Sequence, residues 1–79
     1  MKKTYSITVK VHHFESDFLS LVNRDWEFTV TVTAFSKKEA LRMAHDTARQ
    51  QAAEEWGTSH GHWKTTILRV WDLTHLKAI

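Results

Sequence analysis

The chain has 79 residues, 11 of them basic and nine acidic, with a formal net charge of +2 and no cysteine. This length fits one small domain over residues 1–79, and the lack of cysteine argues against a disulfide framework and for a cytoplasmic location. Lys2 and Lys3 precede no apolar segment, and no stretch approaches the ~20 apolar residues of a membrane span. We therefore expect neither a signal peptide nor contact with a membrane.

Alternating apolar and polar residues predict a first strand over residues 3–13. The apolar positions are Tyr5, Ile7, Val9 and Val11. The residues between them are Thr, Ser and Lys, which suit the exposed face of a half-buried strand.

Residues 15–25 match neither the strand period nor the helix period. Their apolar members are Phe18, Leu19, Leu21 and Val22. The sequence Asn23-Arg24-Asp25 is typical of a turn. We expect a long hairpin connection, with either a short strand or a helical turn, whose apolar residues fold back on the sheet edge.

A second strand is predicted over residues 26–35, and it leads directly into a helix over residues 37–56. The alternating apolar positions of this strand are Trp26, Phe28, Val30, Val32 and Ala34. Ser36 stands three residues before Glu39, the spacing of a capping box, and Gly57 is a natural helix end. One stripe of the helix would allow close approach to a sheet, because it carries Ala40, Leu41, Ala44, Ala48 and Ala52.

A third strand is predicted over residues 64–73, after a loop over residues 58–63. The order ββαβ favours a right-handed crossover from the second strand to the third. The expected fold is α+β: a three-stranded antiparallel sheet in the order 2-1-3, with one helix packed on one face.

The register of the third strand has two solutions. Either Leu68 and Val70 face the helix, or Ile67, Arg69 and Trp71 do. Burying Arg69 without a partner would cost several kcal/mol. We therefore expect Leu68 and Val70 to lie inside, with Ile67, Arg69 and Trp71 on the uncovered face and Trp63 beside them.

We expect no catalytic site and no metal-binding site in this chain. His60 and His62 could share one face of an extended segment, and His12 or His75 could supply a third ligand. Zinc needs three or four ligands, and neither a cysteine nor a second histidine pair is present, so a solvated loop explains His60-Gly61-His62 better. The neighbours His12 and His13 would point to opposite faces of a strand.

Other reactive residues give no stronger signal. Ser59, His60 and Asp72 lack the strained elbow of a nucleophile, Glu54-Glu55 would lie solvated near the helix end, and no glycine-rich loop is present. We expect a protein that is not an enzyme and binds no cofactor and no metal.

The exposed features instead predict protein recognition. Trp and Arg dominate interface energetics, so the expected partner-binding residues are Trp63, Ile67, Arg69 and Trp71. A secondary electrostatic site is expected on the helix at Lys38, Arg42 and Arg49. Two other interpretations stay open: the tryptophans complete the core, or the helix stripe and the aromatic sheet face bind nucleic acid directly. An exposed sheet edge would also permit a homodimer.

One segment resembles a known group of proteins. The pattern Phe28-x-Val30-x-Val32-x-Ala34-x-Ser36-x-x-Glu39-Ala40-Leu41-x-Met43-Ala44 is similar to the strand-to-helix segment of small phage inhibitors, of the T7 inhibitor of host RNA polymerase type and of some anti-CRISPR proteins. The resemblance implies a phage-type inhibitor that blocks a host protein or ribonucleoprotein complex, either a CRISPR effector or RNA polymerase. It assigns no binding residue, because the matching positions are structural ones.

Overall fold

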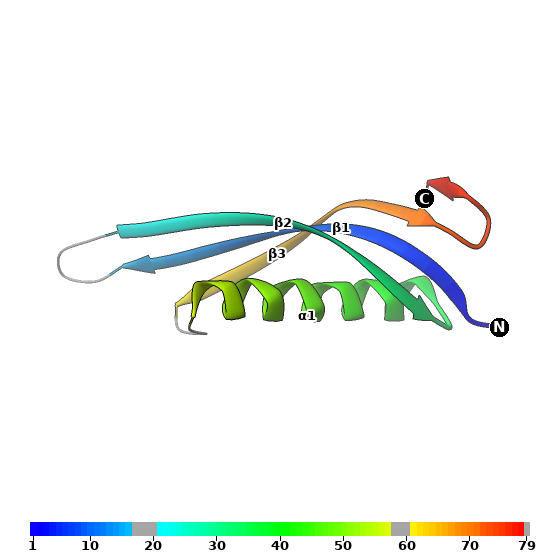
Figure 1. The fold of residues 1–79 in the computed structure, drawn as a ribbon, viewed down its shortest axis with the longest axis horizontal. Helices are drawn as coiled ribbons and strands as arrows, with labels where there is room; N and C mark the ends of the chain where they lie inside the picture. Colours follow the sequence, from blue (N-terminus) through cyan, green and yellow to red (C-terminus); the bar gives the residue numbers. More distant parts are fainter. Residues whose placement is uncertain (17–20, 58–60, 79) are drawn as a thin grey trace.

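The fold is a four-stranded sheet with one helix on one face (Figure 1). The computed structural model describes residues 1–16, 21–57 and 61–78. The elements in chain order are β1 (Lys3–Ser16), β2 (Leu21–Ala34), α1 (Lys37–Trp56), β3 (His62–Asp72) and β4 (Lys77–Ala78). The sheet order is β2-β1-β3-β4 with antiparallel neighbours throughout. The predicted α+β class and the 2-1-3 order of the long strands are confirmed, whereas the short strand β4 was not predicted.

The β1–β2 hairpin is longer than the sequence indicated. Its ladder runs without interruption from the pair Lys3–Ala34 to the pair Ser16–Leu21. The prediction of a turn at residues 23–25 is wrong, because these residues belong to β2 and pair with residues 12–14 of β1. Pairing with a distant strand overrides the local turn preference of Asn and Asp. Phe18 and Leu19 lie outside the described residues.

Helix α1 begins and ends as predicted. The Glu39 backbone N–H donates to the Ser36 hydroxyl at 3.2 Å, and Gly57 ends the helix with φ +93° and donates its N–H to the Ala53 carbonyl at 2.9 Å. Within the described chain, no helix combines the length and the apolar character that crossing a membrane requires.

The core lies between α1 and the sheet. The four alanines of the predicted stripe of α1 are fully buried, and they face the equally buried side chains of Ile7, Val9 and Val11 on the central strand β1. Small side chains let the helix backbone approach the sheet closely. A hydrogen bond between His45 on α1 and Thr65 on β3 ties the helix to the third strand.

A β-bulge interrupts the pairing of β3 with β1. Thr8 pairs with Arg69, but Val9 pairs with Ile67, so Leu68 is an extra residue in β3. A bulge shifts the side-chain alternation by one residue. Ile67 and Val70 therefore both contact the core, although they are three residues apart.

The bulge corrects the predicted register of β3. Val70 lies inside as predicted, but Leu68 is 45% exposed, and Ile67 packs against the core instead of standing on the uncovered face. Arg69 and Trp71 are exposed as predicted. Neither of the two regular registers is correct, because each assumed unbroken alternation.

An aromatic cluster, which we name the tryptophan cluster, closes one end of the core. It consists of His13, Trp26, Trp56 and Trp63. The His13 ring is fully buried, with its centroid 4.1 Å from that of Trp63 and 5.4 Å from that of Trp56. Trp63 thus lies on the helix side of the sheet, and its predicted place beside Trp71 is wrong.

Candidate binding surface

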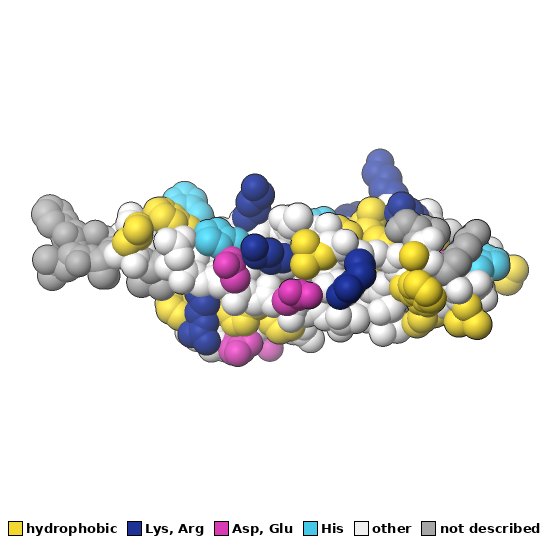
Figure 2. All heavy atoms as spheres, turned by 90° about the horizontal axis from the view of Figure 1, so that it is seen from above, with side chains coloured by type: hydrophobic (Ala, Val, Ile, Leu, Met, Phe, Trp, Pro, Cys, Tyr) yellow, Lys and Arg dark blue, Asp and Glu magenta, His cyan; other side chains and the backbone are white. Residues whose placement is uncertain are grey.

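The face of the sheet turned away from α1 is the open face, and it combines charged and apolar side chains. Figure 2 looks onto this side: basic and acidic side chains mingle near its middle, and hydrophobic side chains lie toward both ends. The exposed apolar residues of β3, Leu68 and Trp71, are 45% and 44% exposed. The open face therefore carries exposed apolar side chains next to charged ones.

We name the exposed residues Leu68, Arg69 and Trp71 the β3 patch. Trp71 pairs with Ser6 on β1 and with Ala78 on β4. Both neighbours have small side chains, so no large cross-strand residue covers the indole. The sequence had placed Arg69 and Trp71 correctly, but it missed Leu68 because only the bulge exposes this residue.

Arg69 stands over a polar part of the sheet. Its guanidinium lies 4.0 Å from the Glu27 carboxylate on β2, and its side chain is 76% exposed. Thr8, which pairs with Arg69, hydrogen-bonds the Thr29 hydroxyl at 3.1 Å. An ion pair this exposed contributes little to stability, so the Arg69 charge remains able to meet a partner.

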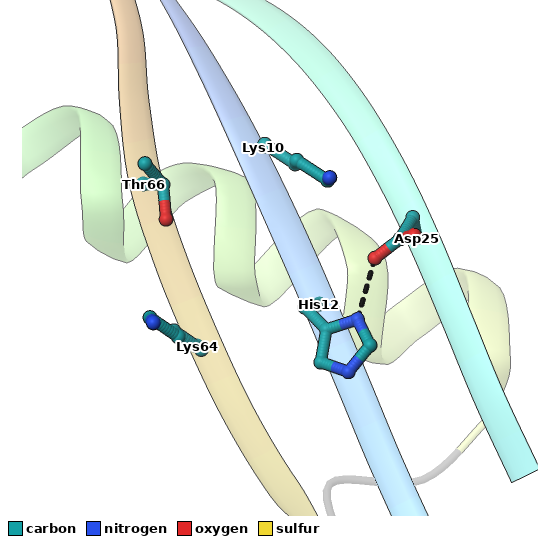
Figure 3. A pocket seen from close by; sticks show the side chains of 5 residues that line it. All are labelled: Lys10, His12, Asp25, Lys64 and Thr66. Atoms are coloured by element: carbon teal, nitrogen blue, oxygen red, sulfur yellow. Dashed lines mark hydrogen bonds and ion pairs between the residues drawn. The ribbon is translucent and has the colours of Figure 1, made fainter.

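A hollow of about 310 Å³ lies farther along the open face (Figure 3). We name it the open-face hollow, and its lining residues come from three strands: Lys10, His12, Asp25, Lys64 and Thr66. The His12 Nδ1–H donates to the Asp25 carboxylate at 2.5 Å. This hydrogen bond, with a smaller contribution from the Lys10 charge, holds the pKa of Asp25 below its usual value.

Sequence reasoning missed this hollow for an identifiable reason. The alternation of β1 already placed Lys10 and His12 on one face, with Lys64 on the expected third strand. Asp25 had been assigned to a turn, so its pairing with His12 across the hairpin could not be expected.

The predicted secondary electrostatic site is only partly assembled. Lys38 and Arg42 line a hollow of about 460 Å³ at the start of α1, together with Ser36 and Glu39. Arg49 is exposed farther along the helix and is not among the described residues lining that hollow. Because α1 covers the opposite side of the sheet, these cations do not share a face with the β3 patch.

The residues considered for chemistry are engaged in structure or are not described. His12 and His13 point to opposite faces, as predicted, since His13 is buried and His12 lines the open-face hollow. The Asp72 carboxylate accepts hydrogen bonds from the N–H groups of Thr74 and His75 and from the His75 ring. Ser59 and His60 lie outside the described residues. No cluster of three or more potential metal ligands occurs within residues 1–16, 21–57 and 61–78.

Comparison with known proteins found no matching family model, no matching curated protein and no matching solved structure. The function must therefore be argued from the surface of the molecule.

Proposed function

We propose that this protein is a non-catalytic binding module that attaches to another protein through the β3 patch. The observation that carries the proposal is Trp71, which is 44% exposed and flanked by Ser6 and Ala78. Arg69 is next to it on the same face, and Leu68 adds a second apolar side chain. Trp and Arg are the residue types most enriched among residues that dominate binding energy.

The class of partner follows from the resemblance of the strand-to-helix segment to small phage inhibitors. We infer a host protein or ribonucleoprotein complex that processes nucleic acid, such as a CRISPR effector or RNA polymerase. The protein would inhibit by covering a surface of that machine. This function needs no catalytic group and no cofactor.

The experiment compares the wild-type protein with Trp71→Ala and Arg69→Ala in capture from a bacterial lysate, followed by mass spectrometry. Assays of transcription and of CRISPR-directed cleavage then test whether the protein inhibits the captured machine. We expect Trp71→Ala to weaken binding by about thirtyfold, as truncation of a central interface residue does. Phe35→Ala is the matched control, because Phe35 is a 66% exposed aromatic outside the patch.

Two results would contradict the proposal. Equal capture by the wild-type protein and Trp71→Ala would show that the β3 patch is not the interface. If nuclease treatment abolishes capture, and affinity for DNA or RNA falls steeply between about 50 and about 200 mM salt, the function is direct nucleic-acid binding rather than protein recognition.

A further inference from the structure

The open-face hollow holds more positive than negative charge. Its charged residues are two cations, Lys10 and Lys64, and one anion, Asp25, and His12 adds a positive charge when protonated. Among the described residues, no ion pair includes Lys10 or Lys64, whereas Asp25 is held by His12. The hollow thus has a net charge of at least one positive unit.

Strand register brings these groups together. His12 pairs with Asp25 on β2 and with Lys64 on β3, and Lys10 pairs with Thr66 on β3. Directly paired residues on one face of a sheet have Cβ atoms about 5 Å apart. The side chains of Lys10, Lys64 and Thr66 therefore line one hollow from neighbouring strands rather than from a loop.

The orientation of the side chains divides the hollow into two sides. Figure 3 shows Lys10 directed toward Asp25, while Lys64 and Thr66 line the opposite side on β3. Asp25 is thus compensated by Lys10 and by the hydrogen bond from His12. The Lys64 ammonium and the Thr66 hydroxyl remain as donors on the β3 side of the hollow.

His12 completes the set of donors. Its Nδ1–H is committed to the Asp25 carboxylate, so Nε2 is the ring atom left for a ligand. When both ring nitrogens carry a proton, Nε2 can donate a hydrogen bond to a ligand. The Lys64 ammonium, the Thr66 hydroxyl and a protonated His12 ring are all donors, and the Lys10 charge lies beside them, which is the composition of a site for a charged oxyanion.

We propose that the open-face hollow binds a phosphoryl group. The volume of about 310 Å³ corresponds to roughly ten water molecules at ~30 Å³ each, which is ample for one phosphate. The group would sit over β1, between Lys64 and Lys10, with Thr66 and His12 Nε2 donating to its oxygens. The source is either free phosphate or the backbone of a single-stranded nucleic acid. This site shares no residue with the β3 patch and does not depend on the proposed protein partner.

The test follows the His12 ring signals by NMR while inorganic phosphate, a short single-stranded oligonucleotide or acetate is added at constant ionic strength. We expect saturable shifts with phosphate or with the oligonucleotide, and far weaker ones with acetate. Lys64→Ala should reduce the affinity by about tenfold or more, because hydrogen bonds to charged groups contribute on that order. Thr66→Val removes the hydroxyl while keeping the shape and should weaken binding by a smaller factor.

Lys37→Ala is the matched control, because it removes the same charge from an exposed residue of α1. Shifts with the oligonucleotide alone would identify a nucleic-acid backbone as the source, and shifts with both phosphate ligands would identify the isolated group as sufficient. Equal shifts with acetate, equal loss in Lys37→Ala and Lys64→Ala, or no saturable shift would each overturn the proposal. Loss of oligonucleotide binding would leave capture through Trp71 intact, so the two proposals fail independently.

Discussion

His13 is a polar residue in the core of the molecule. It is fully buried within the tryptophan cluster, its Nε2–H donates to Glu15 at 3.3 Å, and no partner for Nδ1 is present among the described residues. The backbone of Gly61 lies directly against the ring. The sequence predicted only that His13 and His12 point to opposite faces of a strand, whereas the structure shows the His13 ring packed against the chain just before β3.

Gly61→Ala should therefore destabilise the fold. A Cβ at this position would lie 2.6 Å from His13 Cε1 and 3.0 Å from the Phe14 carbonyl oxygen. Gly57 provides a matched control, because it has the same φ of +93° but a Cβ added there would meet nothing within 4 Å. Both alanines carry a left-handed strain of roughly 1–2 kcal/mol, so the excess loss in Gly61→Ala isolates the clash with His13.

Urea unfolding of the two glycine variants provides the measurement. We expect the free energy of unfolding to fall further for Gly61→Ala, and the tryptophan fluorescence of its folded state to change as the cluster shifts. Equal losses in the two variants would mean that the loop moves away from His13 without penalty.

The Asp72 carboxylate makes the stability of the turn after β3 depend on pH. Its carboxylate is 4% exposed, and hydrogen bonds from the His75 ring at 2.9 Å and from the Thr74 and His75 N–H groups lower its pKa. A lowered folded-state pKa means that the unfolded chain takes up the proton first as the pH falls. This contribution to stability is complete above the unfolded-state value of about 3.9, and it is lost as the pH falls toward the folded-state pKa.

Asp72→Asn should accordingly lower stability at neutral pH, and its deficit relative to the wild-type protein should shrink below about pH 4. Urea unfolding of both proteins across this range measures the difference. A deficit that is constant with pH would show that the carboxylate charge makes no contribution. The acid sensitivity that remains in Asp72→Asn should include a part from Asp25, whose pKa is also lowered.

At the scale of elements, the parts that could be predicted are those with local signals. The Ser36 cap, the alanine stripe and the Gly57 stop all lie within α1 or at its ends, and all three are confirmed. The bulge at Leu68 depends on how β3 pairs with β1, so no pattern inside residues 64–73 reveals it. Arg69 lies outside as its charge predicts, whereas Ile67 packs against the core, because the side-chain alternation breaks between these two residues.

The same limit explains the missed parts of the binding surface. The open-face hollow and the tryptophan cluster both join β1 to residues that pair with it from a distance: Asp25 and Lys64 in one, Trp26 and Trp63 in the other. Residue type alone made Trp71 and Arg69 candidates for an interface, whereas the positions of Trp63 and Ile67 could be known only from the strand register.

The tight packing of α1 against the sheet gives a prediction for the helix. Ala48→Leu should destabilise the protein by about 1–3 kcal/mol, because Ala48 is fully buried and a larger side chain forces the helix away from β1. Thr47→Leu is the control, since Thr47 is exposed on the same helix. Thermal or urea unfolding should show a loss only in Ala48→Leu, and equal behaviour would mean that the interface has room to adjust.

At the scale of the whole molecule, the shape is elongated, with extents of 51 × 17 × 17 Å. The β1–β2 hairpin projects beyond the end of α1 and the start of β3 (Figure 1). The last pair between β1 and β3 joins Phe14 to His62, so the described ladder beyond it consists of two strands only. The tryptophan cluster therefore marks the end of the three-stranded, helix-covered body.

This shape predicts uneven stability along the hairpin. An isolated two-stranded ribbon is marginally stable in water, whereas Ile7, Val9 and Val11 are fully buried beneath α1. We expect the backbone amides of residues 15–16 and 21–23 to exchange with solvent through local opening, far faster than those of Ile7 and Val9. Hydrogen exchange followed by NMR measures both groups in one sample. Protection at the hairpin end equal to that of the core would show that another surface, such as a second copy paired along β2, covers the ribbon, and dilution would then remove that protection.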